Sequence, residues 1–375
     1  MEVRGGIRAQ LHALVNSSAI RLNSQVRKSM LATKRPLMLA LLVLLSLRGV
    51  ARAQDWSFIA RLNPALDEIV AADAKVEKVA DSFGFLEGPV WVRKGGYLLF
   101  SDIPANVIYK FNPPDSKVSV FLAYSGFTGT DSSSAGMQLN NGKGTVTLLG
   151  SNAVTVDPQG RIVYCAHGDR QVVRLEADGR RTVLASQYEG KRLNSPNDLV
   201  FKSDGALYFT DPPAGLRDGD KDPKKELPFN GVYLFKDGQL RLLYKDMALP
   251  NGIAFSPDEK YLYVNDSVKK TILRFEVKPD DTLGEPQLVI DMTSDKAPGG
   301  PDGMKVDQKG NIYCTGPGGF WIVSPEGKHL GTVLTTELPA NLAFGDADGK
   351  TLYLTARTGL YRIRLKVAGI QPRGS

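Results

Sequence analysis

The stretch NGIAFSPDEKYLYVND, residues 251–266, contains the pattern that decides the fold. It begins with an amide side chain, continues as a short apolar strand, turns at a polar SPDEK segment and returns as a second strand of aromatic and β-branched residues. Five other stretches repeat this pattern. Their first residues are Glu87, Asn152, Asn197, Asp302 and Ala340.

The spacing of these six copies predicts the architecture. Successive copies begin 65, 45, 54, 51 and 38 residues apart, and one four-stranded propeller blade takes about 40 to 50 residues. We therefore expect an all-β protein, a six-bladed β-propeller. The last copy is too short for a whole blade, so residues 58–85 should supply closing outer strands. The two longest intervals carry polar insertions, residues 124–144 and 216–231, which we expect to be surface loops.

The net charge of +7 is confined to the N-terminal leader. Residues 1–53 carry nine Lys and Arg and one acid, so the remaining chain has 38 basic and 39 acidic side chains. This balance gives no reason to expect nucleic-acid binding. The contents of 42% hydrophobic and 23% charged residues are those of a soluble globular protein.

The leader has the design of a secretory signal peptide. Lys34 and Arg35 precede an apolar run over residues 37–47, and Ala51-Arg52-Ala53 forms an A-x-A cleavage site. A membrane span needs about 20 apolar residues, so this run is too short for one. We predict cleavage after Ala53, export to the periplasm or the medium, and a single propeller domain over residues 54–375. Met30 is a candidate start of translation.

Propeller geometry predicts a metal site at one end of the central channel. The innermost strand of each blade runs along the channel, so the first residues of the six copies should meet at the same end. Five of the six are carboxylates or amides, which suit a hard divalent cation. Ca²⁺ is expected ahead of Zn²⁺ and Mg²⁺. Zn²⁺ is disfavoured because only His167 and His329 lie outside the leader.

Four motifs resemble one known family. FLEGPVW, EGKRLNSPNDLVFKSDGALYFTDPP, LPNGIAFSPD and PDGMKVD are similar to the gluconolactonase group of the senescence marker protein/gluconolactonase/luciferin-regenerating family. The resemblance implies a six-bladed propeller, one divalent cation and hydrolysis of sugar lactones. Carried over by motif, the metal ligands would be Glu87, Asn197, Asn251 and Asp302. That group often has Glu where Ala166 stands and Tyr where Ala214 stands.

The resemblance also suggests how a lactone would be opened. The cation would polarise the ring carbonyl, and Asp302 would take the proton of the attacking water. Further candidates follow from position. Asn152, Asn197, Lys191 and Arg192 are candidates for binding the substrate, and His167 is either a proton carrier or a packed, hydrogen-bonded side chain.

Three Asp residues end the second strands of their repeats. For Asp102, Asp211 and Asp266 we expect a turn-capping role, in which each carboxylate accepts hydrogen bonds from nearby backbone.

The two cysteines are expected to be free thiols. Cys165 lies in the second repeat and Cys314 in the fifth, which are opposite blades of a six-bladed propeller. A disulfide needs Cα atoms within about 7 Å, which this arrangement does not provide.

Two other functions remain open at this point. One is a phosphotriesterase or arylesterase of the paraoxonase type, which would use the same polar residues on another electrophile. The other is a non-catalytic, Ca²⁺-stabilised propeller that binds a partner. The sequence leaves the physiological substrate and the oligomeric state open.

Overall fold

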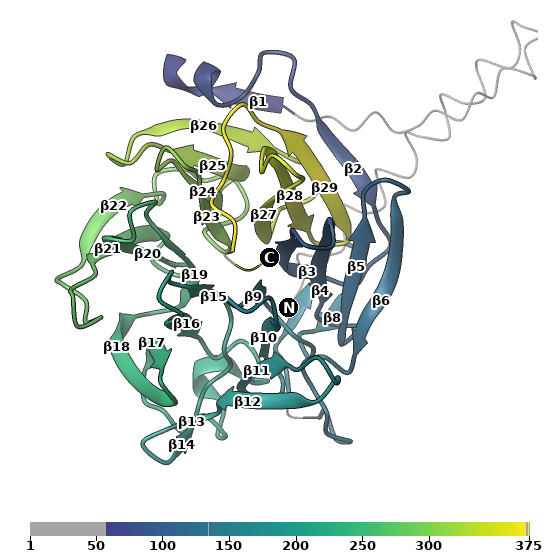
Figure 1. The fold of residues 1–375 in the computed structure, drawn as a ribbon, viewed down its shortest axis with the longest axis vertical. Coiled ribbons are helices and arrows are strands. Elements are labelled where there is room, and N and C mark those ends of the chain that lie inside the picture. The colour runs from purple at the N-terminus through teal and green to yellow at the C-terminus, as the bar shows by residue number, and fades with distance from the viewer. Residues whose placement is uncertain (1–57, 134, 373, 375) are drawn as a thin grey trace, which may run out of the picture. The chain divides into compact units, whose positions relative to one another are not determined.

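The computed structural model describes residues 58–133, 135–372 and 374. Within them the chain forms six sheets of four or five strands, arranged as the blades of a propeller around a central channel (Figure 1). The predicted all-β, six-bladed fold is therefore confirmed. The leader and its proposed signal peptide lie outside the described residues. In the described part, no helix is long and apolar enough to cross a membrane.

The blades follow one another along the chain, and the first strand named in each blade is the innermost one. The first blade is β3 (Leu86–Val92), β4 (Tyr97–Asp102), β5 (Val107–Asn112) and β6 (Lys117–Ala123). The second is β9 (Val154–Val156), β10 (Ile162–Ala166), β11 (Gln171–Leu175) and β12 (Arg181–Ala185). The third is β15 (Leu199–Phe201), β16 (Leu207–Asp211), β17 (Asn230–Lys236) and β18 (Gln239–Met247).

The other three blades continue in the same order. The fourth is β19 (Pro250–Phe255), β20 (Tyr261–Asp266), β21 (Thr271–Glu276) and β22 (Gln287–Asp291). The fifth is β23 (Met304–Val306), β24 (Ile312–Gly316), β25 (Gly319–Val323), β26 (His329–Leu334) and β1 (Phe58–Arg61). The sixth is β27 (Asn341–Gly345), β28 (Thr351–Ala356), β29 (Gly359–Arg364) and β2 (Val76–Ala80).

The propeller is closed by its N-terminal strands. β2 pairs with β29 and so completes the sixth blade, whose other three strands come from the end of the chain. β1 pairs with β26 and adds a fifth strand to the fifth blade. A short 3-10 helix, η2 (Pro64–Glu68), connects these two strands. The expectation that residues 58–85 supply closing strands is confirmed, and closure from both ends protects the edges of these two sheets.

The hydrophobic core lies between neighbouring blades. In one cluster, buried side chains of β16 and β17 pack against those of β19 and β20. Tyr208 and Phe255 meet edge to face in this cluster, with ring centroids 5.0 Å apart. Each blade therefore depends on the next for the burial of its apolar face.

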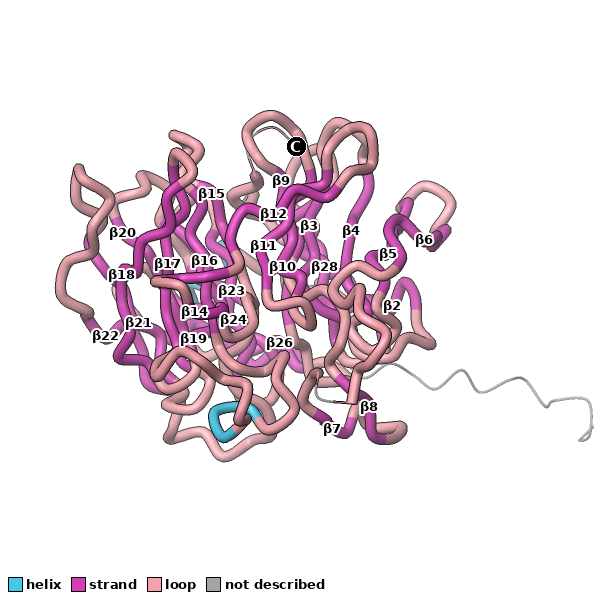
Figure 2. Tube along the Cα trace, turned by 90° about the horizontal axis from the view of Figure 1, so that it is seen from below, coloured by secondary structure: helices cyan, strands magenta, loops and turns pink. Residues whose placement is uncertain are grey.

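Both insertions lie at the end of the channel where the inner strands begin. The first contains β7 (Gln138–Asn140), which pairs with β8 (Thr145–Thr147) just after it, and the second contains the 3-10 helix η3 (Gly219–Lys221). An isolated β-bridge between Ala135 and Leu216 joins the two insertions. Beside it, Gly136 N donates to Gly215 O at 2.7 Å and Met137 N donates to Ala214 O at 3.0 Å. Figure 2 shows β7 and β8 on one face of the propeller and the C-terminus on the opposite face. The predicted loops thus carry short regular structure.

Both cysteines are free and buried, as predicted. Cys165 lies in β10 and Cys314 in β24, which are second strands of the second and fifth blades. Burial raises the pKa of both thiols above its usual range, so both should react slowly.

Candidate functional site

Backbone hydrogen bonds between blades bring the first residues of the six repeats to one level of the channel. In three pairs of neighbouring blades, the residue that follows the first repeat residue donates its backbone N–H. The acceptor is the backbone carbonyl of the first repeat residue in the next blade. These bonds join Ala153 to Asn197 (3.0 Å), Gly252 to Asp302 (3.0 Å) and Gly303 to Ala340 (2.8 Å). We call the six first residues the polar ring: Glu87, Asn152, Asn197, Asn251, Asp302 and Ala340.

Glu87 is the most enclosed carboxylate of the polar ring. It is 3% exposed, and its Oε2 accepts hydrogen bonds from Gly88 N at 2.8 Å and Asn341 Nδ2 at 3.1 Å. Burial raises the pKa of Glu87 well above its usual range, and the nearby carboxylates of Asp302 and Asp198 raise it further. A positive charge at this site would stabilise the ionised form.

Asp302 and Asn251 are neighbours in the polar ring. Burial raises the pKa of Asp302 to about 7, against a hydrogen bond from Asn251 that favours the carboxylate. The Oδ1 of Asn251 is buried and has no hydrogen-bond partner among the described residues. The Oδ1 of Asn152 is orphaned in the same way. Each unpaired buried acceptor lowers the stability of the fold by about 1 to 3 kcal/mol. Both amide oxygens are therefore suited to a bound cation or hydrogen-bond donor.

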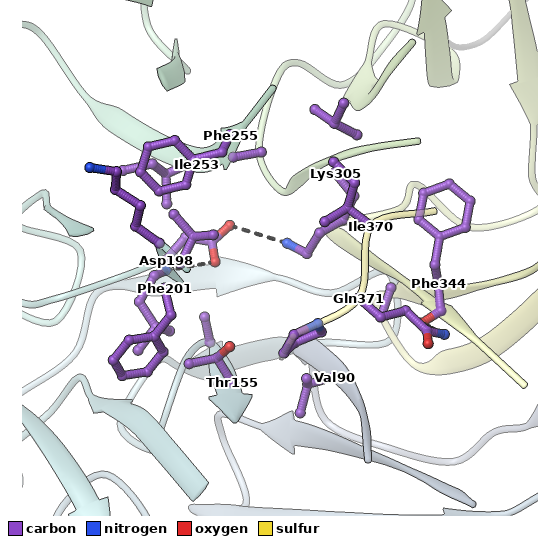
Figure 3. A pocket seen from close by; sticks show the side chains of 18 of the residues that line it. Val90, Thr155, Asp198, Phe201, Ile253, Phe255, Lys305, Phe344, Ile370 and Gln371 are labelled. Atoms are coloured by element: carbon purple, nitrogen blue, oxygen red, sulfur yellow. Dashed lines mark hydrogen bonds and ion pairs between the residues drawn. The ribbon is translucent and has the colours of Figure 1, made fainter. Parts of the chain in front are cut away.

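A second layer of polar side chains lies one step below the polar ring, and the sequence analysis missed it. Asp198 follows Asn197 and is 2% exposed; its Oδ1 accepts from Leu199 N at 2.8 Å. Its Oδ2 lies 3.7 Å from Lys305 Nζ (Figure 3). Asn341, at the matching position of the sixth blade, donates to Glu87. The sequence could have indicated these two side chains only through their position, because Asp198 and Asn341 directly follow polar-ring residues.

Carboxylates at the ends of the second strands hold the loops that lead into the polar ring. Asp102 accepts from the backbone N–H groups three and two residues before Glu87, at 2.9 and 3.1 Å. Asp211 does the same before Asn197, at 2.7 Å for both bonds. Asp266 repeats the arrangement before Asn251, at 2.7 and 3.3 Å. The predicted turn-capping role of the three Asp residues is confirmed.

Polar side chains one residue before these three Asp residues join three of the blades to the next blade. Ser101 Oγ donates to the carbonyl of Asn152 at 2.6 Å, and Thr210 Oγ1 to that of Asn251 at 2.8 Å. Asn265 Nδ2 donates to the carbonyl of Asp302 at 2.5 Å. The backbone of the polar ring is therefore fixed by its neighbours as well as by its own strands.

His167 is buried behind the loop that leads to Asn197. It is 0% exposed, and its Nδ1 lies 2.8 Å from Ser195 Oγ and 3.4 Å from the carbonyl of Pro196. Burial lowers its pKa to about 4, so the imidazole is neutral at neutral pH. These contacts belong to a packed, hydrogen-bonded histidine. A role in proton transfer stays a prediction.

The structure does not bring Lys191 and Arg192 to the polar ring. They form β14 (Lys191–Arg192), which pairs with β13 (Gln187–Tyr188), and both are exposed. Figure 1 shows this hairpin at the outer edge of the propeller, away from the inner strands. Arg192 Nη2 donates to Asp169 O at 3.1 Å. Their predicted contact with substrate gains no support from this position.

The chemistry of the donors decides which cation the polar ring could hold. Among the described residues, no group of three or more His, Cys, Asp and Glu side chains could hold a metal ion. A cation here would therefore need amide oxygens besides the carboxylates of Glu87 and Asp302. The orphaned Oδ1 atoms of Asn152 and Asn251 fit that requirement, and a purely oxygen-donor site is suited to Ca²⁺.

Comparison with known proteins gives consistent matches over most of the chain. A family model described as the SMP-30/Gluconolactonase/LRE-like region matches residues 85–358. A gluconolactonase of Zymomonas mobilis is 36% identical over 321 residues, which cover 83% of this chain and 87% of that protein.

Solved structures agree with this match. A gluconolactonase from Xanthomonas campestris superposes with a TM-score of 0.68 at 30% identity and covers 82% of this chain and 95% of that chain. A calcium-binding protein, the regucalcin of Agrobacterium tumefaciens, superposes with a TM-score of 0.61 at 18% identity. The match covers 80% of this chain and 98% of that chain. At this identity it shows a similar fold only.

Proposed function

Because the chain belongs to the SMP-30/gluconolactonase/LRE-like family and is a lactone hydrolase, we propose that it opens sugar lactones with a divalent cation bound at the polar ring. The gluconolactonases of Zymomonas mobilis and Xanthomonas campestris support the sugar lactone as substrate. A non-catalytic binding propeller is not retained, since the chain is an enzyme.

The observation that carries the proposal is the donor set of the polar ring. Glu87, Asn197, Asn251 and Asp302 would hold the cation. Two carboxylates offset two positive charges, and the orphaned Oδ1 of Asn251 gives a neutral oxygen ligand. The raised pKa values of Glu87 and Asp302 agree with a site built for a counter-ion. Burial disfavours the ionised form of both, the carboxylate of Asp302 raises the pKa of Glu87 further, and that of Asp198 raises the pKa of both. Ca²⁺ is our first choice of cation.

The reaction adds water across the ester bond of the lactone. When bound, the cation would polarise the lactone carbonyl and stabilise the oxyanion. Asp302 would take a proton from the attacking water, and the same proton would then pass to the ring oxygen as the acyl C–O bond breaks. A bound cation would keep Asp302 ionised, so that its carboxylate could accept the proton of the water. Asn152 would orient the sugar, because its free Oδ1 can accept a hydrogen bond from a hydroxyl.

The test is removal and return of the cation. The mature chain, residues 54–375, would be treated with a chelator and assayed on glucono-δ-lactone by acid release in a pH-stat. We expect hydrolysis to fall by about a hundredfold or more and to return with Ca²⁺. Full activity of the chelated protein, with metal analysis showing no residual cation, would refute the role of the cation.

We also propose that the protein is exported after cleavage at the A-x-A site. This rests on the sequence of the leader, residues 1–53. N-terminal sequencing of the exported protein should begin at Gln54. A mature protein that began upstream of residue 37 would contradict the proposal.

A further inference from the structure

The channel contains a cavity below the polar ring, which we call the inner cavity. It has a volume of about 130 Å³ and is lined by inner-strand residues from all six blades. The lining starts one residue after each polar-ring position or later, and no polar-ring residue belongs to it. This inner cavity is therefore distinct from the candidate lactonase site.

Most of the lining of the inner cavity is apolar. Its walls include Val90, Ile253, Phe201, Phe255 and Phe344 (Figure 3). An apolar cavity of similar size in another protein stays dry and binds benzene, so this volume is enough for one six-membered aromatic ring.

One charged pair faces the inner cavity. Asp198 and Lys305 both line it, and their charged atoms are 3.7 Å apart. Lys305 Nζ donates to Met304 O at 2.9 Å, while Asp198 Oδ2 is buried without a hydrogen-bond partner among the described residues. A hydroxyl group could donate to this oxygen and accept from Lys305, which would satisfy the pair.

The C-terminal segment limits access to the inner cavity. Ile370 N donates to Val306 O at 3.0 Å, and Gln371 Nε2 donates to Phe344 O at 3.2 Å. Ile370 and Gln371 both line the cavity, and Ile370 remains 39% exposed. At Gly369 a Cβ atom would lie 1.8 Å from the Phe344 ring, so only glycine allows this close crossing. The C-terminal segment therefore covers part of the inner cavity.

From the size, the apolar walls and the carboxylate oxygen of Asp198 that accepts no hydrogen bond, we propose that the inner cavity binds a small aromatic alcohol. The aromatic ring lies among the Phe, Ile and Val side chains, and the hydroxyl donates to Asp198 Oδ2. The proposal does not depend on lactone hydrolysis or on a cation.

Binding is tested with benzyl alcohol and toluene as probes, by ligand-detected NMR and by calorimetry on the mature chain. Benzyl alcohol should bind saturably at one site, and toluene about tenfold more weakly, because it cannot donate to the carboxylate. A chelator should leave both affinities unchanged. Val90→Phe should abolish binding by filling the cavity, whereas Val268→Phe, at a site 64% exposed, should not.

Three results would overturn the proposal: no saturable binding of either probe, equal affinity for the two, or binding that a chelator removes. If Val90→Phe does not fold, the proposal is tested with a crystal of the unmodified chain soaked in benzyl alcohol. Density for the probe beside Asp198 supports the site, and ordered water alone in the cavity refutes it.

Discussion

The two ends of the channel are built from the same six strands but have opposite chemistry. At the polar ring, five of six positions carry carboxylates or amides, two of them with orphaned oxygens. A few residues further along, the strands present Val, Ile and Phe to an apolar cavity. The strand register brings six residues together at every level. What each level can bind is then decided by the side chains that occupy it.

The largest expected effect contrasts a glutamate at each end. Glu87→Gln removes a charge from the polar ring and should lower lactone hydrolysis by about a hundredfold or more. Glu259→Gln changes a residue that lines the inner cavity and accepts from Ser203 N at 2.9 Å. It should leave the rate within about twofold of the unmodified chain, since it alters only an exposed contact. Steady-state rates at limiting Ca²⁺ check both. Equal losses would remove the distinction between the two ends.

The next contrast concerns buried Asn–carboxylate hydrogen bonds. Asn341→Leu keeps the shape of the side chain but removes the donor to Glu87 and should weaken Ca²⁺ binding by about 10- to 100-fold. Asn311→Leu removes a bond of the same kind, from Asn311 Nδ2 to Asp307 Oδ2 at 2.8 Å, away from the polar ring. This control should not change Ca²⁺ affinity. Unchanged binding in Asn341→Leu would mean that Asn341 does not position Glu87.

A smaller contrast concerns the loop-capping carboxylates. Asp211→Ala leaves two buried N–H groups before Asn197 without their acceptor and should lower the free energy of unfolding by about 2 to 5 kcal/mol. Asp157, 2% exposed, accepts from Gln159 N and Arg161 N at 3.0 and 2.8 Å near the other end. Asp157→Ala should also destabilise the fold. Only Asp211→Ala should lower turnover as well, as urea denaturation and rate assays would show.

The smallest expected effect is a pH dependence from His167. Its pKa is about 4 in the folded chain against 6.5 ordinarily, because burial disfavours the charged imidazole. As pH falls below 6.5, the unfolded chain takes up a proton that the folded chain does not, so stability is complete above this pH and is lost towards pH 4. His167 alone should contribute a loss of about 1 kcal/mol between pH 7 and about 5.5. The raised pKa of Asp302 contributes with the opposite sign in the same range.

The contribution of His167 is measured as the difference in the free energy of unfolding between the unmodified chain and His167→Asn, by urea denaturation at several pH values. This difference should change by about 1 kcal/mol between pH 7 and about 5.5. If His167 instead carries a proton in catalysis, the variant should also lose one limb of the pH–rate profile. A difference that stays constant with pH would contradict the assignment.

The repeat pattern was enough to predict the fold and the level at which Glu87 and Asp302 meet, because strand register fixes both. The free cysteines and the capping Asp residues followed from the same register. The contact between Glu87 and Asn341 could not be predicted, since it joins side chains 254 residues apart in the sequence. The position of Lys191 and Arg192 could not be predicted either, because the sequence did not show that they form an exposed hairpin strand at the outer edge of the propeller. Their contact with substrate stays a prediction.

The most direct measurement is a calorimetric titration of Ca²⁺ into the mature chain after chelator treatment. We predict one Ca²⁺ per chain, and no measurable binding in Glu87→Gln or Asp302→Asn variants that keep the circular dichroism spectrum of the unmodified protein. If the unmodified chain binds no Ca²⁺, or if both variants bind it as tightly as the unmodified chain, the polar ring is not the cation site.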